Sequence, residues 1–381
     1  MKFVIAPDSF KGSLTAKEVA LAIKKGISKI FPTAIFELVP MADGGEGTVQ
    51  SLVDATDGTI ISKEVTGPLG NKVTAKYGLL GNSKTAVIEM AEASGIGYID
   101  KLTANPLITT TFGTGQLIID ALDHNIEEII LGIGGSATND GGAGMAQAIG
   151  IHLLDAKGKE LPFGGAALAH LAKIDTSNID DRLTKVKIVI ASDVTNPLTG
   201  KNGASAVFGP QKGATPKMVQ QLDKSLIHYS EILQKSLNKD VAALPGAGAA
   251  GGLGAGLLAF TTAQMKHGID IVVNYTNLKN KVYGADFVIT GEGGIDFQTQ
   301  YGKTPFGVAQ ASKSISPNIP VIALAGYVGK DVDVLYQDNV IEAIFSTVSG
   351  AKSLERAFED SQDDIAQTSE NIARLIKVLR S

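Results

Sequence analysis

The sequence contains no cysteine among its 381 residues, so it can form no disulfide, and it offers neither a thiolate nucleophile nor a cysteine ligand for zinc. Its five histidines are scattered and form no HExxH pair, so we interpret them as ordinary surface or helix-end residues. The absence of cysteine fits a reducing compartment, and we expect the protein to be cytoplasmic.

Positive charge is also scarce. The formal net charge is -5, and the chain has only four arginines. A protein of this charge has no broad basic surface to attract nucleic acid or an anionic membrane, so we expect neither as a partner. Small molecules are the expected ligands, and any anion site must be local.

Long apolar runs are lacking too. The N-terminal "MKFVIAPDSF" has too few apolar residues before Pro7 for the core of a signal peptide, and it predicts a first strand. The uncharged stretch 246–260, "GAGAAGGLGAGLLAF", spaces glycines as some membrane helices do, but it is shorter than the ~20 apolar residues a membrane span needs. It predicts a tightly packed helix preceded by a turn.

The apolar residues that are present form runs of strand length, followed by polar loops and helix-period segments. The chain is 44% hydrophobic and 19% charged, which is typical of globular proteins. Such alternation predicts βα units and a mainly parallel sheet. The predicted strands are 3–6, 36–39, 128–133, 186–191, 287–290, 320–325 and 341–346.

Two helices are indicated near the ends of the chain. Thr15 and Glu18 have the spacing of a capping box, and Val19 and Ile23 continue one face of the helix that follows. Near the C-terminus, apolar residues at helical spacing predict one helix over 353–379, packed as ordinary core.

Segment 59–88 has a different pattern, with period-two alternation and turn residues that predict antiparallel hairpins. Simple βα alternation returns near residue 286. We therefore predict an α/β protein of two α/β domains. One is Rossmann-like, mainly parallel and split in sequence (1–66 plus 284–381), and the other is an inserted mixed α/β domain (67–283), with the active site in a cleft between them.

Five loops place reactive side chains after predicted strands. In open parallel sheets, ligands bind outside the carboxyl ends of strands, where the next helix presents free N–H groups. One such loop is more often a turn or helix cap than a site, but five together favour a phosphate-handling cleft. The loops are 6–13, 41–48, 132–144, 191–198 and 290–305.

The loop 132–144, "GIGGSATNDGGAG", permits two interpretations. Gly132-x-Gly134-x-x-Ala137 follows a strand and opens a predicted helix, with Asp155 further on, which resembles a dinucleotide fingerprint. Its later glycines would disturb close helix–strand packing, so we favour a general anion site with Ser136 and Thr138 as hydroxyl donors. A dinucleotide-binding oxidoreductase remains the alternative.

The usual phosphate motifs are absent. A Walker A loop would need glycine where Phe297 stands, and neither HRD nor DFG occurs. Phosphoryl transfer still requires cations for the spreading charge, a carboxylate near the attacking hydroxyl and acidic groups for Mg²⁺. No arginine lies in the five loops, so lysines must provide the positive charge, and the candidates are Lys11, Lys212 and Lys303.

Eight motifs, in order along essentially the whole chain, resemble those of the bacterial glycerate kinases of the type I family. They include "FVIAPDSFKGSLTAKEVA", "ADGGEGT", "GIGGSATNDGGAGM", "SDVTNPLTGKNGA", "FGPQKGA" and "TGEGGIDFQTQYGKTPFGVA". The resemblance implies ATP-dependent phosphorylation of D-glycerate to 2-phosphoglycerate, with 3-phosphoglycerate as an alternative product. It also implies ATP and Mg²⁺ as cofactors, with D-glycerate and ATP as partners and a homodimer as an open alternative.

The resemblance places the site on these motif loops. We predict catalytic roles for Asp193, Lys11 and Lys303, and Mg²⁺ binding by Glu292, Asp296 and Asp43. The predicted substrate- or nucleotide-binding residues are Asp8, Ser9, Gly134, Gly135, Ser136, Thr138, Asn139, Asn196, Lys212, Gly291 and Gly293.

One position departs from the family pattern. Relatives typically read TGEGRID, whereas this chain has Gly294 in place of the arginine. If that arginine binds phosphate or the substrate carboxylate, the chain lacks a bidentate cation that lysine does not replace. A non-catalytic sugar-acid sensor is therefore a further alternative.

Overall fold

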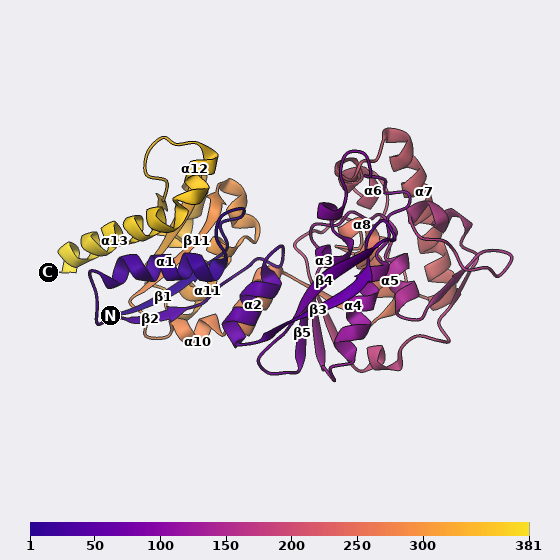
Figure 1. The fold of residues 1–381 in the computed structure, drawn as a ribbon, viewed down its shortest axis with the longest axis horizontal. Coiled ribbons are helices and arrows are strands. Elements are labelled where there is room, and N and C mark those ends of the chain that lie inside the picture. The colour runs from indigo at the N-terminus through magenta and orange to yellow at the C-terminus, as the bar shows by residue number, and fades with distance from the viewer. Residues whose placement is uncertain (381) are drawn as a thin grey trace. The chain divides into compact units, whose positions relative to one another are not determined.

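The structure is a computed structural model that describes residues 1–380, without the side chains of residues 338 and 339. The chain forms two compact units (Figure 1), which we call unit 1, Met1–Asp57 together with the chain from His267 onward, and unit 2, Gly58–Lys266. These units divide the chain after Asp57 and after Lys266. The predicted domain boundaries, after 66 and after 283, stay a prediction.

Unit 1 contains a five-stranded sheet in which all neighbouring strands are parallel, as predicted. Its order is β13 (Ala343–Ser346), β12 (Val321–Val328), β11 (Phe287–Ile295), β1 (Lys2–Pro7) and β2 (Ile35–Leu38). The strand β1, which lies between β11 and β2, is buried along almost its whole length. Strands covered on both faces need near-continuous apolar runs, which is why these segments could be predicted from the sequence.

Helices cover this sheet. Phe3 and Ile5 of β1 share a core cluster with α1 (Ala16–Ser28) and α13 (Ser361–Arg380). Because neighbouring residues of a strand point to opposite faces, Val4 and Ala6 face away from that cluster. The helix α11 (Thr304–Ile315) packs against β1, β11 and β12, and it also contacts α9 (Gly268–Tyr275) and α10 (Leu278–Val282). A further helix, α2 (Thr48–Thr56), packs against α9.

The strand order creates a switch point at the carboxyl ends of β1 and β11. The chain leaves β1 through α1 to reach β2 on one side, and it leaves β11 through α11 to reach β12 on the other. The register pairs Pro7 with Gly291, so Asp8 and Glu292 follow these paired residues at the same edge of the sheet. Ligands of open α/β sheets bind at such a point.

The two predicted helices have different outcomes. Thr15 caps α1 in a capping box with Glu18, as predicted. The single helix predicted over 353–379 is wrong, because the chain forms α12 (Leu354–Glu359) and then α13, with a break at Asp360. The carboxylate of Asp360 accepts hydrogen bonds from Lys352 and Arg356, which holds the break. Leu354 and Phe358 are consequently exposed instead of buried in the core.

Unit 2 has a six-stranded mixed sheet. Its order is β10 (Gln264–Lys266), β9 (Lys187–Ala191), β6 (Glu128–Gly132), β5 (Thr85–Glu89), β4 (Lys72–Leu79) and β3 (Thr59–Thr66). The pairs β3–β4 and β4–β5 are the predicted antiparallel hairpins, and the other pairs are parallel. A small antiparallel pair, β7 (His152–Leu154) and β8 (Lys173–Asp175), was not predicted. The mixed α/β class is confirmed.

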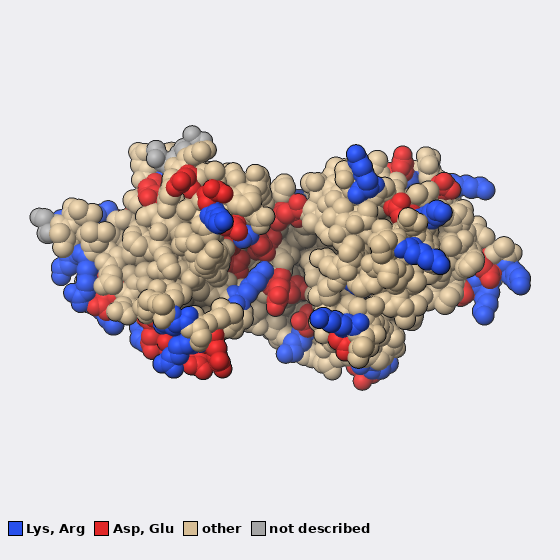
Figure 2. Space-filling view, turned by 90° about the horizontal axis from the view of Figure 1, so that it is seen from above, with Lys and Arg blue, Asp and Glu red and all other residues tan. Residues whose placement is uncertain are grey.

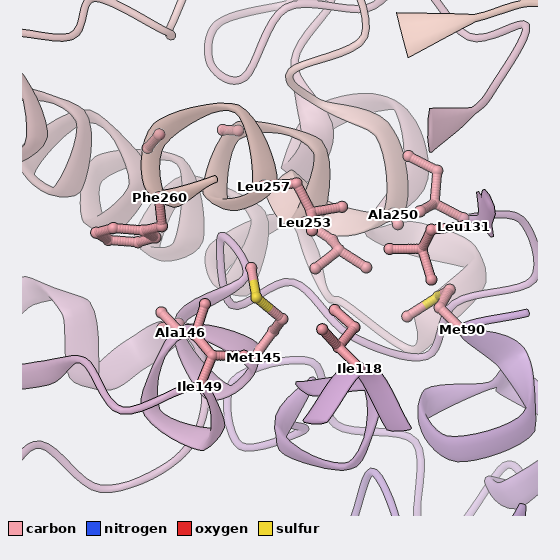
Figure 3. Packing of buried hydrophobic residues seen from close by; sticks show 14 of the residues in the cluster. Met90, Ile118, Leu131, Met145, Ala146, Ile149, Ala250, Leu253, Leu257 and Phe260 are labelled. Atoms are coloured by element: carbon pink, nitrogen blue, oxygen red, sulfur yellow. The ribbon is translucent and has the colours of Figure 1, made fainter. Parts of the chain in front are cut away.

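The helices of unit 2 enclose a large apolar core. They are α3 (Ala91–Ser94), α4 (Phe112–Leu122), α5 (Ala143–Ala148), α6 (Ala204–Phe208), α7 (Pro216–Leu237) and α8 (Ala249–Phe260). In Figure 3, Leu253 of α8 points toward Met145 of α5 and Ile118 of α4. Figure 2 shows Lys and Arg intermixed with Asp and Glu on the visible face of each unit, whereas Asp140 and Lys212 of unit 2 are buried.

The glycine-rich start of α8 has a packing role. Ala250, Gly251 and Gly252 adopt left-handed backbone conformations before the regular helix begins, which matches the predicted turn and helix. The carbonyl oxygen of Gly251 accepts a hydrogen bond from the N–H of Gly141 at 3.0 Å. The glycines therefore let this turn touch the backbone of the loop after β6. Within residues 1–380, no helix is long and apolar enough to cross a membrane.

Replacing Gly251 by alanine is expected to lower the free energy of unfolding by about 2–4 kcal/mol. The φ of Gly251 is +67°, and an added Cβ would lie 2.0 Å from the carbonyl oxygen of Thr138. Gly158→Ala is the matched control, because its φ is +75° but nothing lies within 4 Å of the added Cβ. That control should cost only about 1 kcal/mol of strain. Equal losses for both variants in chemical denaturation would contradict the close contact.

Candidate active site

A charged cluster lies at the switch point of unit 1. Asp8 follows β1, and its Oδ2 accepts a hydrogen bond from Oγ1 of Thr304, the first residue of α11, at 2.5 Å. Oε1 of Glu292 accepts a hydrogen bond from Nζ of Lys303, the residue that precedes α11, at 3.0 Å. Asp43, from the loop before α2, lines the same cavity. The ends of β1 and β11 and the start of α11 thus position two buried carboxyl groups and one lysine.

Burial changes the proton affinity of both carboxyl groups. It raises the pKa of Asp8 to about 6 against the hydrogen bond from Thr304, and the charge of Asp43 adds to the rise. It raises the pKa of Glu292 to about 7 although Lys303 opposes the rise, and the charges of Asp8 and Asp43 contribute to it. Both carboxyl groups therefore titrate closer to neutral pH than ordinary carboxyl groups do, as is common in functional sites.

This cluster opens into a cavity of about 790 Å³ within unit 1. The volume is that of a typical small-molecule site. Its lining includes seven residues that the sequence predicted for the site, and these are Asp8, Ser9, Lys11, Asp43, Glu292, Gly293 and Lys303.

Two predicted residues of unit 1 are not part of the cavity lining. Asp296 caps the 3-10 helix η5 (Phe297–Tyr301), where its Oδ1 accepts a hydrogen bond from the N–H of Gln298 at 2.8 Å. Gly291 lies inside β11, and an added Cβ would lie 2.4 Å from the carbonyl oxygen of Leu324. The absence of a side chain at 291 thus serves strand packing.

The carboxylates of the cavity fit a Mg²⁺ ion that is shared with a phosphate ligand. Among the described residues, no three or more His, Asp or Glu side chains are arranged to hold a metal by themselves. Mg²⁺ usually keeps several waters and needs only one or two carboxylates in addition to phosphate oxygens. Glu292 and Asp43 line the cavity and would supply such oxygens, and a dication would favour the charged form of Glu292. Asp296 does not join them there.

Gly294, the position of the sequence departure, also lines this cavity. Nothing lies within 4 Å of a Cβ added to it, and its carbonyl oxygen is 3.5 Å from Nζ of Lys303. A long side chain at 294 would therefore have room beside Lys303.

Unit 2 has a second group of predicted residues, in the loop after β6. Gly134 and Gly135 are exposed, and Ser136 lies next to them at the edge of the buried region. The N–H of Ile96 donates to the carbonyl oxygen of Gly135 at 2.8 Å, which fixes the loop. The exposed part of the loop is consequently held in one conformation, as an anion site requires.

Lys212 lies behind this loop instead of facing a ligand. Only 1% of it is exposed, and its Nζ donates hydrogen bonds to Oγ of Ser136 at 2.7 Å and to the carbonyl oxygen of Thr138 at 2.6 Å. Burial lowers the pKa of Lys212 to about 7, although the charge of Asp140 opposes the fall. Thr138 and Asn139 are buried as well, and Asn139 binds Ser205. Lys212, Thr138 and Asn139 thus support the loop.

The remaining predicted residues lie after β9. Asp193 is exposed two residues beyond the end of this strand. The side-chain amide of Asn196 donates to the carbonyl oxygen of Asn202 at 2.8 Å, and the carbonyl oxygen of Asn196 accepts from the N–H of Gly248. Because β6 and β9 are parallel neighbours, the loops that follow them leave the same edge of the sheet.

The dinucleotide interpretation of 132–144 is wrong in one structural respect. The fingerprint requires a helix that begins within the glycine motif, so that its N-terminus faces the pyrophosphate. Here the helix α5 begins only at Ala143, after Gly142 in a left-handed conformation, and it has six residues. Residues 133–142 form a loop because Asp140 accepts hydrogen bonds from the N–H groups of Thr111, Gly142 and Gly144.

Comparisons with known proteins identify relatives that match almost the whole chain. Residues 3–377 match the model of the glycerate kinase family. The chain therefore belongs to the glycerate kinase family. A glycerate kinase of Halalkalibacterium halodurans is 54% identical over 97% of each chain, and a glycerate 2-kinase of Escherichia coli K12 is 51% identical over 99% of this chain and 98% of its own.

A solved structure supports the same family. It is the crystal structure of a Salmonella typhimurium LT2 protein whose name contains the words glycerate kinase 2, and it is 50% identical to this chain. The two structures match with a TM-score of 0.92 over 100% of this chain and 99% of the other. The predicted family and the prediction of a kinase are confirmed.

The sequence did not reveal every residue of the charged cluster or of the cavity in this family member. Thr304 was missed, although a hydroxyl at the start of a helix is a frequent partner for a nearby carboxylate. Tyr327, Val348, Leu354 and Phe358 were also missed, and they line the same cavity. Tyr327 lies near the carboxyl end of β12, where a ligand contact could have been expected.

Proposed function

We propose that the chain transfers the γ-phosphoryl group of ATP to the 2-hydroxyl of D-glycerate, giving ADP and 2-phosphoglycerate. The observation that carries the proposal is the gathering of Lys11, Lys303 and buried carboxyl groups around a cavity at the switch point of unit 1. The 51% identical relative named glycerate 2-kinase supports transfer to the 2-position.

Lys11 and Lys303 act on the phosphates. The transferred group spreads negative charge over its oxygens in the transition state, and the protein must stabilise that charge. Both lysines line the cavity, and Lys303 is held by Glu292 at the start of α11. The N-terminus of this twelve-residue helix adds a favourable dipole.

In this proposal Glu292 and Asp43 would hold Mg²⁺. The ion, when bound, supplies positive charge to the oxygens of the β- and γ-phosphates. Asp8 supports the arrangement, because it fixes the start of α11 through Thr304 and places a third carboxyl group beside the other two.

The exposed Gly134 and Gly135 of unit 2, with the hydroxyl of Ser136 beside them, bind the carboxylate of glycerate, and Asp193 orients its 2-hydroxyl. The hydroxyl oxygen attacks the γ-phosphorus, the bond to the bridging oxygen of ADP breaks, and the hydroxyl proton passes to Asp193.

Asp193→Asn is expected to lower kcat by about tenfold, because a loose phosphoryl-transfer transition state needs only modest help from a base. Asp181→Asn, which changes an exposed aspartate of the same unit outside the proposed site, is the control. Near-normal turnover by Asp193→Asn in steady-state kinetics would remove this residue from the base role.

A coupled assay for ADP with D-glycerate, L-glycerate and neighbouring hydroxy acids tests the function. We expect the highest kcat/KM with D-glycerate, and ³¹P NMR of the product should identify 2-phosphoglycerate. A 3-phosphoglycerate signal would correct the position of transfer. Binding of glycerate without ADP release would instead indicate a sensor, and tight NADH binding without ATP turnover would indicate an oxidoreductase.

Gly294→Arg is expected to lower KM for ATP by roughly threefold, since a guanidinium binds phosphate bidentately and the site has room for it. Gly294→Gln, which adds a polar side chain without the charge, is the control. Equal KM values for both variants would show that charge at 294 does not reach the nucleotide.

A further inference from the structure

The cavity of unit 1 is larger than its charged cluster requires. Asp8, Lys11, Asp43, Glu292 and Lys303 account for one part of its lining. The other part comes from the end of β12 and from the segment after β13, and it includes Tyr327, Val328, Val348, Leu354 and Phe358. A three-carbon acid would not need this apolar extension, whereas a nucleotide has both a charged and an apolar end.

The apolar side chains in this extension are unusually exposed. Tyr327 is 67% exposed, Leu354 is 70% exposed and Phe358 is 41% exposed. Burying such area gains about 25 cal/mol per Å², so their gathering around one cavity favours an apolar ligand group that covers them. The exposed Leu354 and Phe358 follow from the break between α12 and α13, which turns an expected core stripe into cavity wall.

Polar contacts fix the helix α12, which carries Leu354 and Phe358, in place beside the cavity. Oγ of Ser13 donates to the carbonyl oxygen of Phe358 at 3.2 Å, which joins α12 to the loop that contains Lys11. Nζ of Lys352 forms ion pairs with Asp360 at 3.1 Å and with Asp364 at 2.8 Å. The positive charge of Lys352 is thus neutralised by two carboxylates, whereas Lys303 pairs with Glu292 alone, so phosphates are attracted to Lys11 and Lys303 instead of to this end.

We propose that Tyr327, Val348, Leu354 and Phe358 form the binding site for the purine base of ATP. The triphosphate then extends to Lys11 and Lys303. This inference rests on the proposed kinase activity. Unit 1 then binds the nucleotide at the switch point of its parallel sheet, where open α/β sheets bind such ligands.

The test is a set of exposed-residue variants in the full-length enzyme. Tyr327→Ala and Leu354→Ala should each raise KM for ATP by about tenfold and leave KM for D-glycerate within twofold of wild type. Both residues are mostly exposed, so the fold should be retained. Tyr283→Ala, at a residue of the same unit that is 79% exposed and outside the cavity, is the matched control and should change neither constant.

Inorganic tripolyphosphate separates the base from the phosphates. As a competitor of ATP it should inhibit wild type, Tyr327→Ala and Leu354→Ala equally, because it has no base. A rise in KM for glycerate alone, or an unchanged KM for ATP in both variants, would overturn the base site. If wild type showed no kinase activity, the proposed function would fail, but ADP titration calorimetry with the same variants would still test the base site by the same tenfold difference.

Discussion

Lys303→Met is expected to lower kcat/KM for the phosphorylation of D-glycerate by about 100- to 1,000-fold, the usual effect of removing one preorganised charge from a transition state. Lys303 lines the cavity, and its Nζ is 3.0 Å from Glu292. Most of the loss should appear in kcat, because the phosphoryl charge is greatest in the transition state. Steady-state kinetics with varied ATP and varied glycerate separate the two constants.

Two controls separate this charge from a structural role. Lys330→Met removes an exposed lysine of the same unit that does not line the cavity, and it should keep wild-type kinetics. The double variant Lys303→Met, Glu292→Gln removes the buried carboxylate that Lys303→Met leaves without its partner. It should recover unfolding free energy but not activity. Recovery of activity together with stability would show that neither the charge of Lys303 nor the carboxylate of Glu292 is needed for the reaction.

The strands of both units were predictable because their signal is local. Strands buried on both faces, such as β1, need continuous apolar runs, and the hairpins of β3, β4 and β5 need alternation and turn residues. The capping box of α1 is also local, since Thr15 and Glu18 are three residues apart. Each of these features follows from a few neighbouring residues.

The errors came from contacts between distant segments. The break between α12 and α13 depends on Asp360, whose carboxylate binds Lys352 and Arg356, and helical periodicity does not show such a network. The late start of α5 depends on Asp140, which draws the N–H groups of Thr111 and Gly142 to its carboxylate. Both residues look like ordinary polar positions in the sequence.

The residues of the candidate site likewise fall into those that the sequence could indicate and those that it could not. The sequence could indicate Asp8, Lys11, Glu292 and Lys303, because each follows a recognisable strand in a motif loop. It could not indicate that Lys212 is buried behind Ser136, since lysine is almost always exposed. It also could not indicate the apolar wall around Phe358, which exists only because α12 ends where it does.

Lys212→Met is expected to raise KM for glycerate by about tenfold and to leave KM for ATP near the wild-type value. Methionine has a similar shape but donates no hydrogen bond, so Ser136 and the carbonyl oxygen of Thr138 lose their buried partner. The exposed part of the loop beside Gly135 should then be less well fixed. Lys217→Met, at an exposed lysine of the same unit, is the control. An equal rise in both KM values would show that Lys212 does not act specifically on glycerate binding.

Comparing wild type with Lys212→Met also tests the proton affinity of Lys212. Its pKa is lowered by burial from 10.5 in the unfolded chain to about 7 in the folded one, so between these values the unfolded chain binds more protons. The free energy of unfolding of wild type should therefore rise with pH in this window, by about 2 kcal/mol relative to Lys212→Met from pH 8 to pH 9.5. Because other titrating groups are common to both proteins, chemical denaturation at the two pH values gives the difference directly. Parallel pH curves for the two proteins would mean that Lys212 keeps an ordinary proton affinity, and that its ammonium stays fully charged behind the loop.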